Sequence, residues 1–476
     1  MSFTSLTFLF CFLPIFVNFY SLIPTKLSNI ILLFFSIIFY FGGEPAPVFL
    51  LTFALSIIAN YLIVLFMEWS NGNIKKLFLV LGVLGNLTIL FFFKYINFVI
   101  KIIENIIHTS FAVLHTSDNT LGLPLGISFI TFRVISYIVD VYRGNTQAEK
   151  SILRLATYIS MFPIITAGPI VRYESVINEL KARTISKDDL IHGIKLFIIG
   201  LSFKAILANQ FSIYADAVFS QKPAHLSIYL AWVGAISYTF QIYFDFAGYS
   251  IMAVALGRMI GLKFPDNFRL PYLSLSVTEF WRRWHMTLTS WLRDYLYIPL
   301  GGNRKGRLIT YRNLFIVFLL CGIWHGANFT FIVWGIYHGL FLIIERALKE
   351  SKIKISFPRF LNHVYLMLVV TIGWVLFRSE DLHYATDYIG LMFGLLKSDA
   401  LYTNNALFSY TTSLTIIMLI GCICSIFNER NILSYERKTK SSLLTISHYI
   451  FYLIFFIISI MSLVLNTRNA FIYRQF

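Results

Sequence analysis

The sequence predicts an all-α integral membrane protein that crosses the bilayer many times. Of its 476 residues, 57% are hydrophobic and only 13% are charged, and the mean hydropathy is +0.72. Soluble globular chains carry about twice that share of charged residues. Apolar runs close to the roughly 20 residues that a helix needs to span a bilayer recur from one end of the chain to the other.

The apolar runs indicate about a dozen membrane-spanning helices. The candidate spans are residues 3–23, 28–42, 46–68, 76–103, 122–142, 152–170, 190–214, 225–258, 310–325, 328–347, 360–377, 409–428 and 445–467. The first has the length of a signal peptide but neither a basic N-terminal region nor a small-residue cleavage pattern, so we expect it to be retained. Several runs are too long or too short for one straight crossing, which is typical of helices that tilt or break.

The polar stretches between the spans are short, and no repeat of fixed period is present. We therefore expect residues 1–476 to form a single transmembrane domain whose chemistry takes place at or within the membrane. The net charge of +16 comes from basic residues in the short connectors, as the positive-inside rule predicts for cytoplasmic loops. No basic groove with interleaved aromatic residues stands apart from the spans, which disfavours nucleic-acid binding. The four cysteines lie in apolar segments and are expected to serve packing.

Polar residues that break the apolar pattern are densest between about 245 and 339. Asp245 and Arg258 lie in one apolar run, where they are expected either to pair with each other or to contact a substrate. Ser276 and Glu279 have the S-x-x-E spacing of a capping box, which predicts a helix from about residue 276. On that helix one broad aromatic and apolar face carries Trp281, Trp284, His285, Leu288, Trp291, Leu292 and Tyr295. We expect an interfacial helix whose arginines meet lipid phosphates or an anionic ligand.

The next two segments are a glycine-rich loop and a pair of histidines. The run IPLGGNRKGR lacks the Lys-Ser/Thr ending of a nucleotide loop, so we interpret it as a cytoplasmic connector. In CGIWHGANFTFIVWGIYHG, at 321–339, His325 and His338 would lie ~20 Å apart if the segment were one helix, which disfavours a shared metal or haem site. For His338 we expect a hydrogen bond to a neighbouring helix. Trp324 and Gly326 flank His325 as a histidine lining a narrow channel requires.

At this point the sequence resembles a known family. FWRRWHMTLTSWLRDYLYIPLGGNRKG and LLCGIWHGANFTFIVWGIYHGL are similar to the signature region of the membrane-bound O-acyltransferases, in the bacterial branch that contains alginate O-acetyltransferase. The resemblance extends through LPLGISFITFRVISYIVDVYRG, FPIITAGPIVRY and FDFAGYSIMAVALGRMIGLKFPDNFRLPYLS. It covers about residues 1–470, with the signature region at 244–345.

The resemblance implies a ring of helices around a central tunnel, with His325 of the Trp-His-Gly motif as the catalytic residue. The second polar position of the family maps to His285. Acyl transfer from a thioester to a hydroxyl needs a base, and neutral imidazole suits this role near pH 7. Because burial disfavours the charged form, we expect His325 to be a neutral general base. His285 then orients His325, polarises the thioester carbonyl or binds the hydroxyl acceptor. The residues expected to line or support the tunnel are Trp324, Asn328, Trp284, His338 and Asp245.

The family resemblance also implies an acyl donor. We expect no bound cofactor and no metal, with acetyl-coenzyme A or another acyl thioester as the donor substrate. The basic residues expected at the donor's phosphates on the cytoplasmic side are Arg282, Arg283, Arg304 and Lys305. The same residues suit anchoring to lipid phosphates equally well.

The expected function is O-acetylation of an envelope polysaccharide, either an exopolysaccharide such as alginate or peptidoglycan, from the bacterial cytoplasmic membrane. The resemblance implies an extracytoplasmic SGNH-hydrolase-like acetyltransferase partner that completes the transfer, and the sequence has no G-x-S-x-G elbow that would supply this second active site. D-alanyl transfer to teichoic acid from a carrier-protein thioester is the alternative within the family.

Two other classes of function remain open. A proton-coupled transporter without acyl chemistry would use the polar residues Asp140, Asp216, Asp245, His325 and His338 as a relay. Against it stands the lack of paired, glycine-interrupted halves. A scaffold that only recruits envelope enzymes would not depend on His325.

Overall fold

The structure, a computed structural model, describes residues 1–43, 47–108, 123–351, 357–397, 411–426 and 442–465. All the regular structure in this part of the chain is helical, which confirms the all-α prediction. The chain divides into two compact units, Met1–Ile194 with Met252–Pro265 and Lys195–Ile251 with Asp266–Phe476. The expectation of a single transmembrane domain over residues 1–476 stays a prediction.

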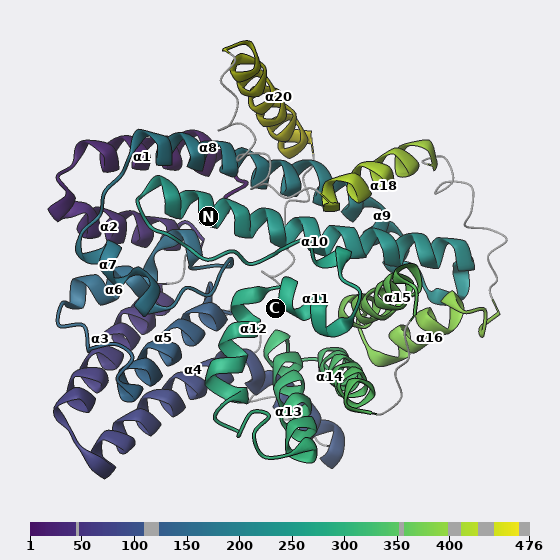
Figure 1. Cartoon of the computed structure of the whole chain (residues 1–476), viewed down its shortest axis with the longest axis horizontal. Helices are drawn as coiled ribbons and strands as arrows, with labels where there is room; N and C mark the ends of the chain where they lie inside the picture. Colours follow the sequence, from purple (N-terminus) through teal and green to yellow (C-terminus); the bar gives the residue numbers. More distant parts are fainter. Residues whose placement is uncertain (44–46, 109–122, 352–356, 398–410, 427–441, 466–476) are drawn as a thin grey trace. The chain divides into compact units, whose positions relative to one another are not determined.

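The first unit is a set of packed helices in which α3, α4 and α5 lie side by side (Figure 1). Its helices are η1 Phe8–Phe12, α1 Leu13–Leu22, η2 Thr25–Leu27, α2 Ser28–Phe41, α3 Pro47–Trp69, α4 Gly72–Ile107, α5 Ile127–Arg143, α6 Ile152–Ser160, η3 Phe162–Ile164, α7 Tyr173–Lys181 and the start of α8 Lys187–Ser202. At the turn into α5, Gly126 has a φ of +71° and a Cβ there would lie 1.9 Å from the Ile165 carbonyl oxygen. Only glycine fits this close approach.

The second unit contains all of the predicted signature region except the segment 252–265. Its helices are the end of α8, the π-helix η4 Phe203–Ala208, α9 Asn209–Phe219, η5 Pro223–His225, most of α10 Ile228–Met259, η6 Pro271–Leu273, α11 Val277–Arg283, α12 Met286–Leu292, the π-helix η7 Arg293–Tyr297, α13 Arg307–His325, α14 Phe329–Glu350, α15 Arg359–Arg378, α16 Leu382–Met392, α18 Thr411–Ile426 and α20 Ser442–Leu465. α8, η4 and α9 form one helical run without a break.

The predicted spans correspond to helices. Among the described residues, seven helices are long and apolar enough to cross a membrane: Val48–Trp69, Gly72–Ile107, Lys187–Phe219, Arg307–His325, Phe329–Glu350, Arg359–Arg378 and Ile446–Leu465. Shorter apolar helices occupy four further predicted spans: Phe8–Leu22, Thr25–Phe41, Ile152–Ile164 and Thr415–Ile426. A multi-pass membrane protein is confirmed, whereas the count of about a dozen crossings and the central tunnel stay predictions.

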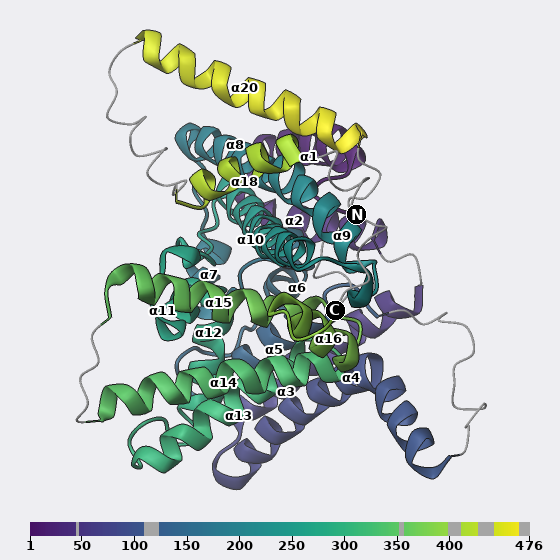
Figure 2. The ribbon, with the colours of Figure 1, turned by 90° about the vertical axis from the view of Figure 1, so that its right-hand side faces the viewer.

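A tight antiparallel hairpin of α13 and α14 positions the predicted catalytic region, and α15 packs along α14 (Figure 2). The two helices of the hairpin cross at Gly322 and Gly335: a Cβ on Gly322 would lie 2.3 Å from the Phe331 carbonyl oxygen and 3.1 Å from the Gly335 Cα. This crossing corrects the single-helix geometry considered for residues 321–339, because the chain reverses between His325 and Phe329. The two histidines therefore lie on antiparallel helices.

The amphipathic helix predicted from residue 276 begins as expected but is not continuous. Ser276 accepts a hydrogen bond from the Glu279 N–H, and the Glu279 carboxylate accepts the N–H of Leu275. The helix then breaks at His285, whose backbone is left-handed with a φ of 43°, and α12 follows. The physical reason is a second segment alongside the break, since the Asn267 carbonyl oxygen accepts the Met286 N–H at 2.9 Å.

Candidate active site

His325 is the last residue of α13 and is buried among aromatic rings. Its ring centroid lies 4.8 Å from that of Trp324, 4.9 Å from that of Trp334 and 5.1 Å from that of Phe377. Only 4% of the residue is exposed. The C-terminus of a helix carries partial negative charge, which stabilises an imidazolium as it forms. The position therefore suits a histidine that takes up a proton during a reaction.

The turn after His325 is fixed by Asn328. The Asn328 side chain accepts the Thr330 N–H at 3.1 Å, so it caps α14, and it donates to the Glu380 carbonyl oxygen at 2.7 Å. Asn328 thus ties the turn between α13 and α14 to the segment just after α15. The expectation that Asn328 supports the tunnel stays a prediction, but this geometry identifies it as a helix cap.

Four tryptophans, Trp281, Trp284, Trp334 and Trp374, form a buried tryptophan cluster next to His325. Trp334 is 5.6 Å from Trp281 and 6.2 Å from Trp374, and Trp374 is 4.8 Å from Trp284. Among the described residues, the indole N–H groups of Trp281, Trp334 and Trp374 have no hydrogen-bond acceptor. The tryptophan cluster therefore presents buried donors without acceptors, which native proteins rarely leave unexplained.

His338 differs from its prediction. Neither of its ring nitrogens has a hydrogen-bond partner among the described residues, so the expected bond to a neighbouring helix is wrong. Instead its ring packs edge-on against Trp281 at 5.2 Å and Trp334 at 5.1 Å, and Gly373 of α15 leaves room for it. Trp334 contacts both rings: His338 lies one turn further along α14, and the hairpin brings His325 of α13 against the same indole.

His285 is hydrogen-bonded to Asn267. The Asn267 Oδ1 atom lies 2.9 Å from His285 Nδ1 and accepts the Thr287 hydroxyl at 2.8 Å, while Asn267 Nδ2 donates to the Ser250 hydroxyl at 3.1 Å. The residue is only 1% exposed, and burial lowers the pKa of His285 to about 3. His285 is therefore neutral over the whole physiological pH range. Sequence reasoning missed Asn267, because no spacing signal connects it to His285.

The sequence suggested that Asp245 pairs with Arg258, but the structure pairs it with Lys204. Its carboxylate lies 2.6 Å from the Lys204 ammonium group on η4, with side-chain exposures of 1% and 5%. Arg258 pairs instead with Asp189 in the first unit, at 3.1 Å. Lys204 was overlooked, although a lysine inside the apolar run IIGLSFKAILA is the signal that should have identified it.

The four basic residues predicted for the donor's phosphates lie at the surface of the second unit. Arg283 pairs with Glu279 at 2.7 Å, and Arg282, Arg304 and Lys305 are exposed. The loop that carries Arg304 is ordered by Asn313, whose side-chain amide donates to the carbonyl oxygens of Leu300 and Gly302. No contact in the structure brings the 282–283 pair and the 304–305 pair together within the described residues.

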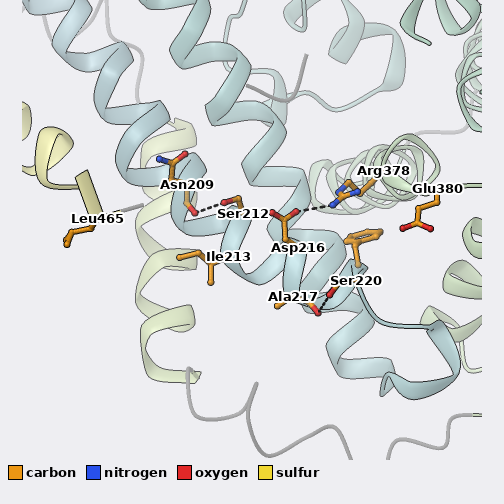
Figure 3. Close-up of a pocket in the computed structure, with 10 residues that line it drawn as sticks. Asn209, Ser212, Ile213, Asp216, Ala217, Ser220, Arg378, Glu380 and Leu465 are labelled. Carbon is orange, nitrogen blue, oxygen red and sulfur yellow. Dashed lines mark hydrogen bonds and ion pairs between the residues drawn. The ribbon is translucent and has the colours of Figure 1, made fainter. Parts of the chain in front are cut away.

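A polar cavity of about 610 Å³ opens along α9 and beside the end of α15 (Figure 3). Arg378 and Asp216 line the cavity and form an ion pair with a guanidinium-to-carboxylate distance of 3.0 Å, and Glu380 is also part of the lining. The residue before Arg378 is Phe377, whose ring packs against His325. Neighbouring residues at the end of α15 thus contact the histidine and line the cavity.

The predicted proton relay is not supported by the environment of its carboxylates in the second unit. Asp216 is paired with Arg378 and Asp245 with Lys204. Each of these two carboxylates thus forms an ion pair with a basic side chain instead of facing another residue of the predicted relay. Among the described residues, no three His, Cys, Asp or Glu side chains are grouped as a metal site requires.

Comparisons with known proteins agree with the resemblance seen in the motifs. The model of the MBOAT, membrane-bound O-acyltransferase family, matches residues 148–378. The chain is 45% identical over 399 residues to a probable alginate O-acetylase, AlgI, of Pseudomonas putida, an alignment that covers 83% of this chain and 80% of that protein. It is 37% identical over 370 residues to a peptidoglycan O-acetyltransferase of Helicobacter pylori, which covers 71% and 69% of the two chains. A teichoic acid D-alanyltransferase of Bacillus subtilis is 32% identical over 290 residues, 57% of this chain and 72% of that one.

Proposed function

Because the chain belongs to the membrane-bound O-acyltransferase family, and is therefore an acyltransferase, we propose that it moves an acetyl group from a cytoplasmic thioester to a hydroxyl of an envelope polysaccharide. The observation that carries this proposal is His325, a buried histidine that ends α13 among three aromatic rings. Relatives named for acetylating alginate and peptidoglycan support acetyl as the acyl group.

In the proposed reaction, neutral His325 removes the proton of the acceptor hydroxyl as its oxygen attacks the thioester carbonyl carbon. The tetrahedral intermediate then collapses, the carbon–sulfur bond breaks, and the imidazolium returns the proton to the leaving thiolate. The products are an ester and a free thiol, so no net proton is consumed. The α13 C-terminus stabilises the imidazolium while it exists, and the aromatic walls keep water away from the thioester.

Charge at the ends of α13, α14 and α15 supports an orientation in the membrane. One end of this group carries Arg307, Arg346, Lys349 and Arg359, whereas at the other end the described turn after His325 is uncharged and Arg378 is followed by Glu380 and Asp381. Basic residues gather on the cytoplasmic side of bacterial membrane proteins. We therefore place the basic end in the cytoplasm, and His325 with the polar cavity towards the outer face of the cytoplasmic membrane.

The donor in this proposal is acetyl-coenzyme A. At 1.5 Å per residue, Arg307 lies ~27 Å from His325 along α13, so Arg304 and Lys305 beside it are far from the reaction centre and suit lipid phosphates better. Arg282 and Arg283 follow Trp281, which contacts Trp334 and through it His325. They are the stronger candidates for the donor's phosphates.

An acceptor glycan and an extracytoplasmic SGNH-hydrolase-like partner complete the proposal. The polar cavity at Asp216 and Arg378 lies on the proposed outer side and carries hydroxyl, amide and charged groups, which suits a polar acceptor or a partner's side chain. D-alanyl transfer from a carrier-protein thioester is the second candidate, favoured by relatives named as teichoic acid D-alanyltransferases, which are less similar to this chain than the alginate O-acetylases.

The proposal is tested with the purified chain in nanodiscs, radiolabelled acetyl-coenzyme A, and a glycan or partner as the acceptor. His325→Ala should lower thiol release and label transfer by about 10²- to 10⁴-fold, the usual contribution of a general base. The matched control is His383→Ala, since the His383 side chain is 88% exposed, and it should keep wild-type turnover. Equal turnover in His325→Ala and wild type would reject the assignment of the base, and turnover only with a D-alanyl carrier protein would favour the second candidate.

A further inference from the structure

The hydrogen bonds around Asn267 determine which nitrogen of His285 carries the proton. The backbone N–H of Thr287 points at Asn267 Oδ1 at 3.3 Å, and Asn267 Nδ2 donates to Ser250. A backbone N–H can only donate, so the atom that faces it must be the amide oxygen. An oxygen with no hydrogen of its own can only accept from His285 Nδ1. Neutral His285 therefore carries its proton on Nδ1, and its Nε2 is an acceptor with a lone pair.

The Nε2 atom of His285 is buried and has no hydrogen-bond donor among the described residues. A buried acceptor without a donor is costly, and the backbone here is also strained, because His285 has a φ of 43°. The Phe246 ring packs edge-on against the imidazole at 4.7 Å and fixes its plane. The Phe246 contact, the Nδ1–H tautomer and the left-handed backbone together fix the direction of the lone pair on His285 Nε2.

This geometry narrows the three roles that the sequence left open for His285. Polarising a thioester carbonyl requires an N–H donor, which Nε2 is not. Receiving an O–H or N–H group from a substrate requires an acceptor, which Nε2 is. Trp284, the residue before His285, belongs to the tryptophan cluster. The indole N–H groups of the other three tryptophans in this cluster are buried donors without acceptors among the described residues.

We propose that Asn267 locks His285 as the Nδ1–H tautomer so that Nε2 receives a hydrogen bond from a substrate N–H or O–H group. This inference rests on the proposed function, which supplies two sources for that group. One is an amide of the pantetheine arm that carries the thioester, whose N–H matches Nε2 and whose carbonyl oxygen matches an indole N–H. The other is the acceptor's hydroxyl. His285 is then a substrate-binding residue and Asn267 a positioning residue.

The first experiment is ¹⁵N NMR of histidine-labelled protein in nanodiscs, with His285 assigned by its absence in His285→Gln. We expect a pyrrole-type Nδ1 and a pyridine-type Nε2 that does not titrate near neutral pH, and an Nε2 resonance that shifts when coenzyme A or the acceptor is added. A pyrrole-type Nε2, or an Nε2 resonance that moves with neither compound, would overturn the proposal. Asn267→Leu should release the lock and yield a mixture of the two tautomers.

Kinetics distinguish the two sources. Acetyl-pantetheine with methylated amide nitrogens lacks the N–H donors, so KM should rise about 10- to 100-fold if the donor's amide binds Nε2, and this penalty should vanish in His285→Leu. If the acceptor's hydroxyl binds Nε2, the same pattern should appear with an acceptor that lacks one hydroxyl. Ser250→Ala is the control for Asn267→Leu, because it removes only the partner of Nδ2 and should keep the tautomer.

The outcomes separate this inference from the proposed function. If the wild-type protein transfers no acyl group from any thioester, the proposed function fails whatever the tautomer. If transfer depends on His325 but neither analogue distinguishes wild type from His285→Leu, only the role of His285 fails.

Discussion

Removing one partner of the buried pair between Lys204 and Asp245 should destabilise the protein strongly. The charges lie 2.6 Å apart with side chains 5% and 1% exposed. The helices approach closely enough for this contact because Gly248 of α10 faces Gly200 and Lys204: a Cβ there would lie 2.7 Å from the Gly200 carbonyl oxygen. A single replacement leaves an uncompensated charge in an apolar interior. For Asp245→Asn or Lys204→Met we therefore expect a loss of about 3–5 kcal/mol in the free energy of unfolding.

The double replacement distinguishes a structural pair from a functional one. Lys204→Met combined with Asp245→Leu removes both charges, and such apolar replacements are neutral or stabilising. The free energies of unfolding are measured by denaturant titration in mixed micelles, followed by tryptophan fluorescence. Asp189→Asn is the matched control, because the pair of Asp189 with Arg258 is over a third exposed on both sides and should be worth at most about 1 kcal/mol.

Two results would refute this reasoning. One is a double variant as unstable as either single variant, and the other is single variants no more damaging than Asp189→Asn. Acyl transfer by the double variant gives a separate answer: retained turnover assigns Asp245 to structure alone, and lost turnover with retained stability revives its suggested contact with substrate.

Three further predictions follow from packing, capping and charge. Gly322→Ala places a Cβ against the helix that carries Gly335, so we expect a loss of about 1–3 kcal/mol in unfolding free energy together with reduced acyl transfer. Glu345→Gln replaces the carboxylate that accepts two N–H groups at the start of α11 with a neutral amide. We expect the free energy of unfolding, measured by the same titration, to fall by about 1–2 kcal/mol. Burial alone would raise the pKa of Glu149, but hydrogen bonds, first among them those from Arg154, lower it overall. Its carboxylate therefore stabilises the fold at pH values above the usual pKa of about 4.3, and this stabilisation is lost as the pH falls through the lower pKa of the folded state. Glu149→Gln should therefore flatten the acid side of a plot of melting temperature against pH. An unchanged plot would contradict this role of Glu149.

Local sequence features predicted the helices and their ends well. The runs at 310–325 and 328–347 became α13 and α14 within a few residues, and the capping box at Ser276 starts α11 where its spacing predicted. The failures lie where distant segments meet. Nothing near residue 285 in the sequence indicates that Asn267 interrupts the helix there, and nothing near Asp245 favours Lys204 over Arg258 as its partner.

The sequence by itself was sufficient to predict a helical membrane protein and to identify His325 and His285 as candidate catalytic residues. Those conclusions depend on the hydropathy of short runs and on motif letters, which act locally along the chain. Only the tertiary structure decided that His325 and His338 share Trp334, that Lys204 neutralises Asp245, and that Asn267 fixes the proton of His285. The contacts of His325 with Trp334, of Lys204 with Asp245 and of Asn267 with His285 each join segments that are separated along the chain. Close crossings such as that of Gly322 with Gly335 bring such segments together, and no local pattern encodes which helices cross.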